Sequence, residues 1–397
     1  MSAVLRVLVV DDSAFMVRTL KQMLESSPDI KVVGVAQNGK EAIQMTSDLK
    51  PDIITMDIEM PVMNGIDAIQ NIMQNNPTPI LVISTHTTDG AQVTIDALTS
   101  GAVDFILKNS AFNANQLMLM RDEIIEKVLA IGRNSSLRNE LTRQSVLKVQ
   151  AHKTPVNTIQ PPVPKLLVRT DTVSSAVQNV YSNAASSQEQ LRKRPAQSYF
   201  KIAMIGISTG GPLSLQKLLP VINEPLPVPL LIVQHMPAKF TASLAERLNA
   251  MCKFRVKEAE HGEQLQAGTV YIAQGGMQMT VTKQHTIDIS HEPSAVLYKP
   301  SVDVLAQSVL EVYGGKVLGI MMTGMGRDGA DTYKLLHQAG AYIVSQNAET
   351  SVVYGMPKAV NDEGIAHEIV GLEAMAGVIT QCLTSKSTTP VGVGTFA

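Results

Sequence analysis

The sequence of 397 residues lacks the features that mark several classes of protein. It has no tryptophan, only two cysteines, Cys252 and Cys382, and a formal net charge of −2. Two cysteines so far apart fit neither a disulfide framework nor the spacing of a zinc site, so we expect two reduced thiols in a cytoplasmic protein. The small net charge gives no electrostatic reason to expect a nucleic-acid partner.

Long apolar runs are also missing. No stretch approaches the roughly 20 residues that a helix needs to cross a bilayer. The N-terminal residues run directly into the acidic pair Asp11-Asp12, unlike a secretory leader with its apolar stretch and small-residue cleavage site. Both observations favour a cytoplasmic location without membrane insertion.

Two sets of alternating strands and helices are predicted. Short β-branched runs at 7–10, 31–36, 52–56, 80–84 and 103–107 make the first set, and runs at 201–207, 229–234, 270–273, 317–322 and 341–345 make the second. Strands that alternate with helices form parallel sheets covered on both faces. The predicted fold class is therefore α/β, with two doubly wound parallel-sheet domains.

The segment between the two sets is polar. Residues 133–198 are rich in Gln, Ser, Thr, Pro and Val, which predicts a flexible linker, and their basic run Arg192-Lys193-Arg194 is expected to be solvated rather than a docking site. Residues 386–397 are expected to be a disordered tail. The predicted domains are thus residues 1–132 and 199–385.

Acidic residues are expected where strands of the first domain end. Asp11 and Asp12 follow its first strand, Asp57 follows the third and Lys108 the fifth. These ends share one edge of a parallel sheet, where three carboxylates repel one another unless a hard cation such as Mg²⁺ lies among them. Isolated aspartates more often cap helices, but their joint placement with Lys108 and the Ser84 hydroxyl favours a metal-assisted phosphoryl acceptor site.

Residues 4–131 resemble the receiver domain of bacterial response regulators. The resemblance lies in Val9-Val10-Asp11-Asp12-Ser13, in Met56-Asp57-Ile58-Glu59-Met60-Pro61-Val62-Met63-Asn64-Gly65 and in Asp104-Phe105-Ile106-Leu107-Lys108. It implies a flavodoxin-like fold and a partner histidine kinase. It also implies these roles: phosphorylation of Asp57, Mg²⁺ binding by Asp11, Asp12 and Asp57, contact with the phosphoryl group by Ser84 and Lys108, and an aromatic switch at Phe105. Asn109 departs from the proline that is common after the family's lysine.

The strand predicted at 201–207 ends in Gly206-Ile207-Ser208-Thr209-Gly210-Gly211-Pro212. A dinucleotide fingerprint requires glycine where Ser208 stands, and a phosphate-binding loop requires lysine where Pro212 stands. The remaining pattern, G-x-S-x-G, is typical of a tight turn that projects a nucleophilic serine. A Ser-Thr pair that only caps the next helix stays an alternative at this point.

Two further strand ends supply partners for Ser208. His235 follows the strand at 229–234 and Asp328 lies in the glycine-rich segment after 317–322. A histidine can remove the serine proton, and a carboxylate fixes the histidine tautomer and stabilises its cation. The order usual in α/β-hydrolases would instead pair Asp328 with His337 or His367, and the residues alone leave both sets open.

Residues 199–383 resemble the catalytic domain of chemotaxis protein-glutamate methylesterases. Four motifs carry this in order: Ile207-Ser208-Thr209-Gly210-Gly211-Pro212, Val233-Gln234-His235-Met236-Pro237, Met322-Thr323-Gly324-Met325-Gly326-Arg327-Asp328-Gly329 and Val353-Tyr354-Gly355-Met356-Pro357. The resemblance implies a Rossmann-like fold and selects Ser208, His235 and Asp328. It places Thr209 at an auxiliary position and Met325 at an oxyanion position.

The same resemblance implies the activity and the partners. The enzyme is expected to hydrolyse glutamate methyl esters on the cytoplasmic part of methyl-accepting chemoreceptors, to deamidate receptor glutamines as well, and to need no cofactor for either reaction. It would act peripherally at receptor arrays, under control of a chemotaxis histidine kinase through Asp57, which needs Mg²⁺. The alternatives are a phosphorylation-controlled receptor-binding module without turnover and a DNA-binding regulator, for which a basic recognition helix is missing.

Overall fold

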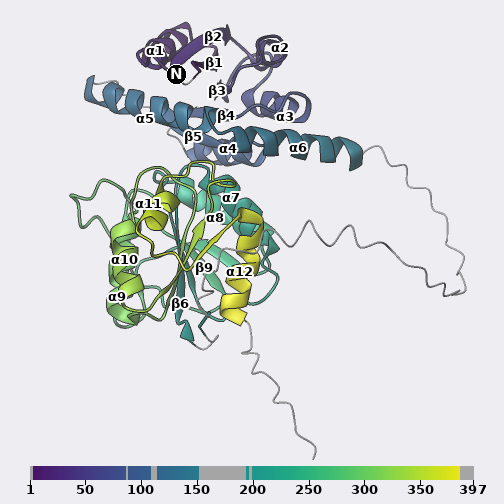
Figure 1. The fold of residues 1–397 in the computed structure, drawn as a ribbon. Coiled ribbons are helices and arrows are strands. Elements are labelled where there is room, and N and C mark those ends of the chain that lie inside the picture. The colour runs from purple at the N-terminus through teal and green to yellow at the C-terminus, as the bar shows by residue number, and fades with distance from the viewer. Residues whose placement is uncertain (1–2, 86–87, 109–113, 152–193, 196–198, 385–397) are drawn as a thin grey trace, which may run out of the picture.

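The computed structural model describes residues 3–85, 88–108, 114–151, 194–195 and 199–384. These residues form two α/β domains stacked on one another, with the N-terminal domain above the C-terminal domain in Figure 1. In the described part of the chain, no helix is both long and apolar enough to cross a membrane. The predicted tail and most of the predicted linker lie outside the described residues.

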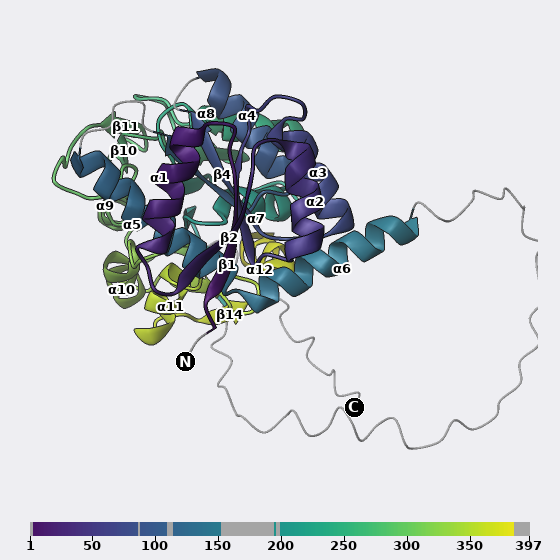
Figure 2. The same cartoon turned by 90° about the horizontal axis from the view of Figure 1, so that it is seen from above.

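The N-terminal domain is built on a parallel sheet of order β2-β1-β3-β4-β5. Its strands are β1 (Leu5–Val10), β2 (Ile30–Ala36), β3 (Ile53–Asp57), β4 (Ile80–Thr85) and β5 (Asp104–Lys108). Helices α1 (Ala14–Glu25) and α5 (Ala114–Gly132) cover one face, and α2 (Gly39–Leu49), α3 (Gly65–Asn75) and α4 (Thr88–Thr99) cover the other (Figure 2). The chain winds in both directions from β1, so the ends of β1 and β3 border a topological switch point.

The C-terminal domain has a seven-stranded parallel sheet of order β14-β13-β12-β6-β7-β9-β8. Its strands are β6 (Ile202–Ile207), β7 (Leu230–Gln234), β8 (Arg255–Glu258), β9 (Thr269–Ile272), β12 (Val317–Met321), β13 (Tyr342–Gln346) and β14 (Glu368–Val370). A separate antiparallel hairpin joins β10 (Gln278–Val281) and β11 (Ile287–Ser290). Because the sheet grows in opposite directions from β6, a crevice is expected at the carboxyl end of that strand.

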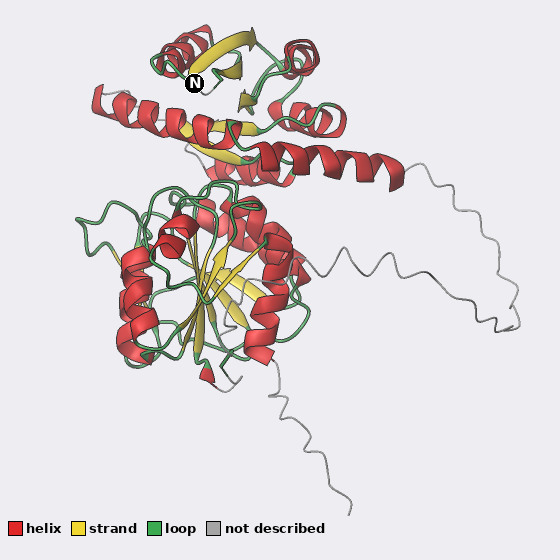
Figure 3. Cartoon of the chain, viewed as in Figure 1, coloured by secondary structure: helices red, strands yellow, loops and turns green. Residues whose placement is uncertain are grey.

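Helices cover both faces of this second sheet (Figure 3). On one side lie α7 (Gly211–Leu218), α8 (Phe240–Met251) and α12 (Leu372–Thr384), and on the other α9 (Val302–Tyr313), α10 (Ala330–Gln338) and α11 (Met356–Asp362). The central strands β6, β7 and β12 are buried at every position, which is why they appear in the sequence as continuous apolar runs. The predicted α/β class with two parallel-sheet domains is confirmed.

The prediction that a flexible linker begins at residue 133 is wrong for its first part. Residues Ser135–Ala151 form helix α6, whose Leu137 and Leu141 are buried in the core of the N-terminal domain. The Asn134 side chain accepts a hydrogen bond from the Leu137 N–H at 2.9 Å and so starts the helix. The polar composition concealed this helix, because Leu137 and Leu141 are its buried apolar residues within the part of α6 whose side chains are described, residues 135–143.

The two domains contact each other through α4, which packs on α7 and α8, through β5, and through Asn134 at the start of α6. Phe105 of β5 stacks on Phe240 of α8, with ring centroids 4.8 Å apart and planes inclined by 12°. The Asn134 amide donates to the carbonyls of Ser351 and Val352 at 2.8 and 2.9 Å. The N-terminal domain therefore lies across the end of the C-terminal sheet at which α7 and α8 begin (Figure 1).

Candidate active site and phosphoryl acceptor site

Ser208 stands at the predicted turn between β6 and α7. Its N–H donates to the Thr323 carbonyl at 2.9 Å, which ties the turn to the end of β12. Gly210 has φ +74°, a conformation that favours glycine, and a methyl group there would lie 2.4 Å from Val352 Cβ. The turn therefore requires both the backbone freedom and the small size of glycine.

His235 and Asp328 lie next to this turn. The final residues of β6 and β7 are paired in register, and the His235 N–H donates to the Ile207 carbonyl at 3.1 Å, so Ser208 and His235 follow adjacent strand ends. His235 Nε2 lies 2.7 Å from Asp328 Oδ2. His235 Nδ1 is buried and has no hydrogen-bond partner among the described residues, which leaves it available for proton transfer.

The start of helix α9 holds the Asp328 carboxylate. Ser301 Oγ donates to Oδ1 at 2.8 Å, and the Val302 N–H donates to Oδ2 at 2.7 Å. Burial raises the pKa of Asp328, but the hydrogen bonds from His235, Val302 and Ser301 outweigh it, so the pKa lies below its ordinary value. The carboxylate is therefore ionised and fixed at neutral pH, as the orienting member of a triad must be.

The glycine-rich segment after β12 packs against the turn that carries Ser208. A methyl group on Gly324 would lie 2.8 Å from Ser208 Cβ. The Gly324 carbonyl accepts from the N–H groups of Gly355 and Met356 at 3.0 and 2.9 Å. Met325 follows Gly324 at this close approach, which is where an amide could reach an oxyanion.

The remaining predicted residues of this domain are Thr209, expected at an auxiliary position, and the two rival histidines. Thr209 is buried, and its carbonyl accepts from Thr323 Oγ1 at 2.9 Å. The rival histidines, His337 and His367, pack with their ring centroids 4.9 Å apart, whereas the hydrogen bonds of Asp328 go to His235 and to α9. The geometry thus pairs Asp328 with His235.

Sequence reasoning missed Ser301 and Tyr298. Ser301 caps α9 and stands directly before the apolar stretch that begins at Val302, so a capping signal was available. Tyr298 stacks on the His235 imidazole, with ring centroids 4.3 Å apart and planes inclined by 4°. No local pattern marks Tyr298, because this contact joins a loop to the end of a distant strand.

The carboxylates predicted in the N-terminal domain converge. One oxygen from each of Asp11, Asp12 and Asp57 can be chosen so that all three lie within 4.8 Å of one another. Lys108 Nζ lies 2.6 Å from Asp57 Oδ2 and 2.9 Å from Asp11 Oδ2. Burial is the largest influence on Asp57 and raises its pKa, with Asp11 acting in the same direction and Lys108 against both. A hard cation fits this set because it would offset the repulsion among three carboxylates.

Ser84 and Phe105 lie on the paired neighbouring strands β4 and β5. Ser84 lines a small hollow together with Asp57 and Gly90, and its hydroxyl contacts Thr94 Oγ1 at 2.5 Å. Phe105 is buried at the domain interface, where it stacks on Phe240. Asn109, which stands where the family commonly has proline, lies outside the described residues.

Comparisons with known proteins agree with this arrangement. The family model for the response regulator receiver domain matches residues 7–120, and the model for the CheB methylesterase matches residues 203–379. A protein-glutamate methylesterase/protein-glutamine glutaminase of Idiomarina loihiensis is 42% identical over 94% of this chain and 97% of that protein. One of Shewanella frigidimarina is 40% identical over 94% of this chain and 98% of that protein.

A solved structure is also similar. The crystal structure of the Thermotoga maritima CheB methylesterase catalytic domain is 35% identical and covers 46% of this chain and 98% of that chain, with a TM-score of 0.45. The two full-length relatives decide the assignment, because they align along nearly the whole of both chains. The chain belongs to the protein-glutamate methylesterase/protein-glutamine glutaminase family, in which a response regulator receiver domain precedes a CheB methylesterase domain.

Proposed function

We propose that this chain hydrolyses the methyl esters of glutamate side chains on the cytoplasmic part of chemoreceptors, and that it also deamidates glutamines there. The observation that carries the proposal is the convergence of Ser208, His235 and Asp328 at the carboxyl edge of one parallel sheet. The names of the full-length relatives supply both reactions. In this proposal the enzyme acts in the cytoplasm, at receptor arrays and without inserting into the membrane.

The residues support a double-displacement reaction. His235 Nδ1 removes the proton from Ser208 Oγ, and Oγ attacks the ester carbonyl carbon. Backbone amides near Met325 stabilise the oxyanion, and methanol leaves with the proton that His235 returns. Water then attacks the acyl-enzyme by the same route and releases glutamate. Asp328 holds Nε2 throughout and stabilises the imidazolium, so no cofactor enters this chemistry.

The two ring nitrogens of His235 have exchanged roles compared with those of the catalytic histidine in chymotrypsin-like proteases. There the acid binds Nδ1 and the serine faces Nε2. Here Asp328 contacts Nε2, and Nδ1 is the nitrogen without a partner in the described residues. Both nitrogens can perform either role, since the hydrogen bond to one nitrogen fixes the tautomer of the other.

In the receiver domain, Asp57 is the proposed phosphoryl acceptor from a chemotaxis histidine kinase. Asp11, Asp12 and Asp57 would hold Mg²⁺, which supplies positive charge to neutralise the transferring phosphoryl oxygens. Lys108 Nζ lies 2.6 Å from Asp57 Oδ2 and adds a positive charge at the site. Ser84 lines the small hollow beside Asp57. A charged phosphoryl group would compete for Lys108 and Ser84 and so alter the neighbouring β5.

The interface explains how phosphorylation could control hydrolysis. The Val352 carbonyl accepts a hydrogen bond from the Asn134 side chain of the receiver domain. The Val352 side chain packs against Gly210, two residues after Ser208. Phe105 stacks on Phe240, which begins the helix that follows the His235 loop. A receiver docked in this way covers the catalytic edge of the sheet, and loosening these contacts would open it to a receptor helix.

Methanol release from methylated receptor membranes tests the catalytic proposal. The full chain should release methanol, and Ser208→Ala should reduce the rate about 10⁴-fold or more. Unchanged release by Ser208→Ala would overturn the mechanism. Receptor binding without methanol release by either protein would instead support the binding-module alternative, which the hydrogen-bonded His235–Asp328 pair disfavours.

A further inference from the structure

We propose that Tyr298 is a positioning residue for the general base His235, held in place by the buried amide of Gln278. The proposal rests on the function proposed above and adds a residue to its machinery. The aromatic face of Tyr298, rather than its hydroxyl, fixes the plane of the imidazole in which proton transfer takes place.

The hydrogen bond to Asp328 alone cannot fix the imidazole. A single contact at Nε2 sets one end of the ring but allows the plane to turn, so Nδ1 could move away from the serine. The Tyr298 ring lies almost parallel to the imidazole, at an inclination of 4° and a centroid distance of 4.3 Å. Stacking at this separation opposes rotation of the plane and therefore supplies the missing restraint.

The backbone around Tyr298 is itself held by Gln278. Gln278 is fully buried, and its Nε2 donates to the Tyr298 carbonyl at 2.8 Å, while its Oε1 accepts from the Ser301 N–H at 2.9 Å. Ser301 Oγ in turn donates to Asp328. One buried amide thus joins the residue that stacks on His235 to the residue that orients its acid.

The hydroxyl of Tyr298 points to a different neighbour. It lies 3.3 Å from the position that a methyl group on Gly326 would occupy, so it is close to the glycine-rich loop. A phenylalanine would keep the stacked face and lose only this polar end. Leu297, the preceding residue, is 84% exposed and offers a matched control on the same loop.

The experiment compares Tyr298→Phe, Tyr298→Leu and Leu297→Ala with the wild-type full chain. Misplacement of a catalytic group by about 1 Å costs roughly 100-fold in rate. Tyr298→Leu should therefore lower kcat for methanol release about 10- to 100-fold with KM within about twofold, whereas Tyr298→Phe and Leu297→Ala should keep kcat within about threefold. Labelling of Ser208 by a fluorophosphonate should likewise be slower in Tyr298→Leu than in Tyr298→Phe and Leu297→Ala.

Two results would overturn the proposal. A Tyr298→Leu protein with wild-type kcat and labelling rate would show that the stack does not position His235, and raised KM with unchanged kcat would make Tyr298 a substrate contact instead. If Tyr298→Leu does not fold, as judged by thermal melting, Tyr298→Met keeps the bulk without the ring. If the wild type labels at Ser208 but releases no methanol, the proposed substrate fails, and the labelling rates still decide the role of Tyr298.

Discussion

Asp328 receives three kinds of donor at once, and this determines what a substitution there would do. The His235 ring, the Ser301 hydroxyl and the Val302 N–H all donate to its two oxygens. An asparagine would place an NH₂ group against one of these donors, or would turn and offer a donor to His235. Either arrangement favours the wrong tautomer of the imidazole.

We therefore predict that Asp328→Asn lowers kcat for methanol release by about 10³- to 10⁴-fold, as the corresponding change does in serine proteases. The control is Asp331→Asn, an exposed position in the first turn of α10 whose carboxylate pairs with Arg327. That control should retain nearly full activity. A loss of less than about tenfold in Asp328→Asn would mean that the carboxylate does not orient the base.

Gly210 allows a second prediction at the residue scale. Alanine there would adopt φ near +74° and would also lie 2.4 Å from Val352. Gly262 has a similar φ of +77°, but nothing lies within 4 Å of a methyl group placed on it. Gly262→Ala therefore isolates the backbone cost of about 1 kcal/mol, and Gly210→Ala adds the steric clash.

Denaturant unfolding should show that difference. Gly262→Ala is expected to lose about 1 kcal/mol of unfolding free energy with unchanged activity. Gly210→Ala is expected to lose about 2–4 kcal/mol and most of its activity, because the turn that carries Ser208 has to move. Equal losses in the two variants would show that Val352 yields without cost.

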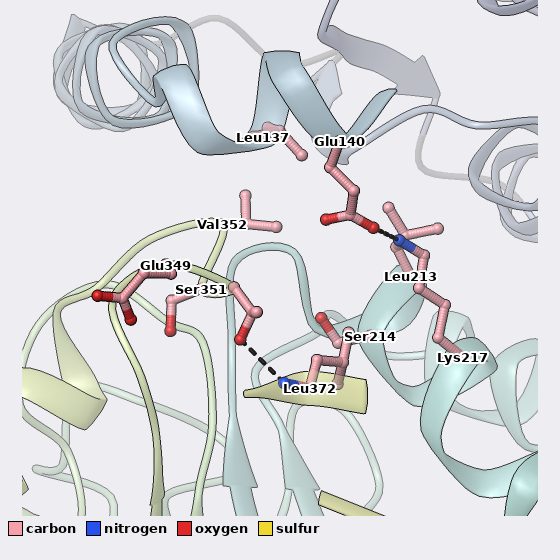
Figure 4. Close-up of a pocket in the computed structure, with 10 residues that line it drawn as sticks. Leu137, Glu140, Leu213, Ser214, Lys217, Glu349, Ser351, Val352 and Leu372 are labelled. Atoms are coloured by element: carbon pink, nitrogen blue, oxygen red, sulfur yellow. Dashed lines mark hydrogen bonds and ion pairs between the residues drawn. The ribbon is translucent and has the colours of Figure 1, made fainter. Parts of the chain in front are cut away.

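At the scale of elements, α6 is both part of the receiver core and a contact with the catalytic domain. Its Leu137 lines a small crevice together with Val352, and its Glu140 extends toward α7 (Figure 4). Glu140 Oε1 accepts from Lys217 Nζ at 2.6 Å. Both partners of this ion pair are about 30% exposed, so solvent weakens it.

We predict that Glu140→Gln raises the basal activity of the unphosphorylated chain modestly. A partly exposed ion pair stabilises by about 0.2–1 kcal/mol, so methanol release should rise by no more than about fivefold. Glu25→Gln, which removes the same charge from an exposed position of α1, is the control and should leave the rate unchanged. A drop in basal rate for Glu140→Gln would indicate that this contact supports activity instead of restraining it.

The elements that the sequence predicts well are those whose pattern is local. β6, β7 and β12 lie between helices on both faces, so their residues are apolar throughout, and the polar residues after them mark the catalytic edge. Helix α6 was missed because, among its residues 135–143, the buried apolar side chains are Leu137 and Leu141 in an otherwise polar segment. The roles of Tyr298 and Gln278 could not be predicted, because they depend on contacts between a loop, a hairpin and a strand end.

At the scale of the whole molecule, the two sites are coupled only if the Asp57 region can act on the interface. Lys108 ends β5, and Phe105 lies in the same strand and stacks on Phe240. If phosphorylation of Asp57 moves Lys108, the change would reach the Phe105–Phe240 contact through residues 105–108 of β5. This is a short path through one rigid element.

We predict that a small phosphodonor such as acetyl phosphate, with Mg²⁺, raises methanol release by the full chain. The rise should disappear in Asp57→Asn and when a chelator removes Mg²⁺, because three carboxylates cannot accept a dianion without a neutralising cation. Asp67→Asn, at an exposed position in the first turn of α3, should respond like the wild type. Activation that persists in Asp57→Asn would place the acceptor elsewhere.

Removal of the receiver provides the most direct test of restraint by the whole interface. A fragment that begins at Tyr199 keeps the complete seven-stranded sheet and the proposed triad but loses the Phe105–Phe240 stack, the Asn134 contacts and the Glu140–Lys217 pair. An aromatic pair stabilises by about 0.5–1.5 kcal/mol, and an exposed ion pair by less. The fragment should therefore release methanol about tenfold or more faster than the unphosphorylated full chain.

The covalent link between the domains determines how strongly a separate receiver fragment can inhibit the catalytic fragment. Within one chain the receiver meets its docking surface at an effective concentration on the order of millimolar, whereas separate fragments at micromolar concentration rarely meet. Residues 1–151 added in equimolar amount at about 10 µM should thus inhibit the catalytic fragment only slightly, and inhibition should grow as the receiver concentration approaches the millimolar range. Equal rates for fragment and full chain would contradict restraint by the receiver, and strong inhibition at 10 µM would mean that the interface is far tighter than these contacts suggest.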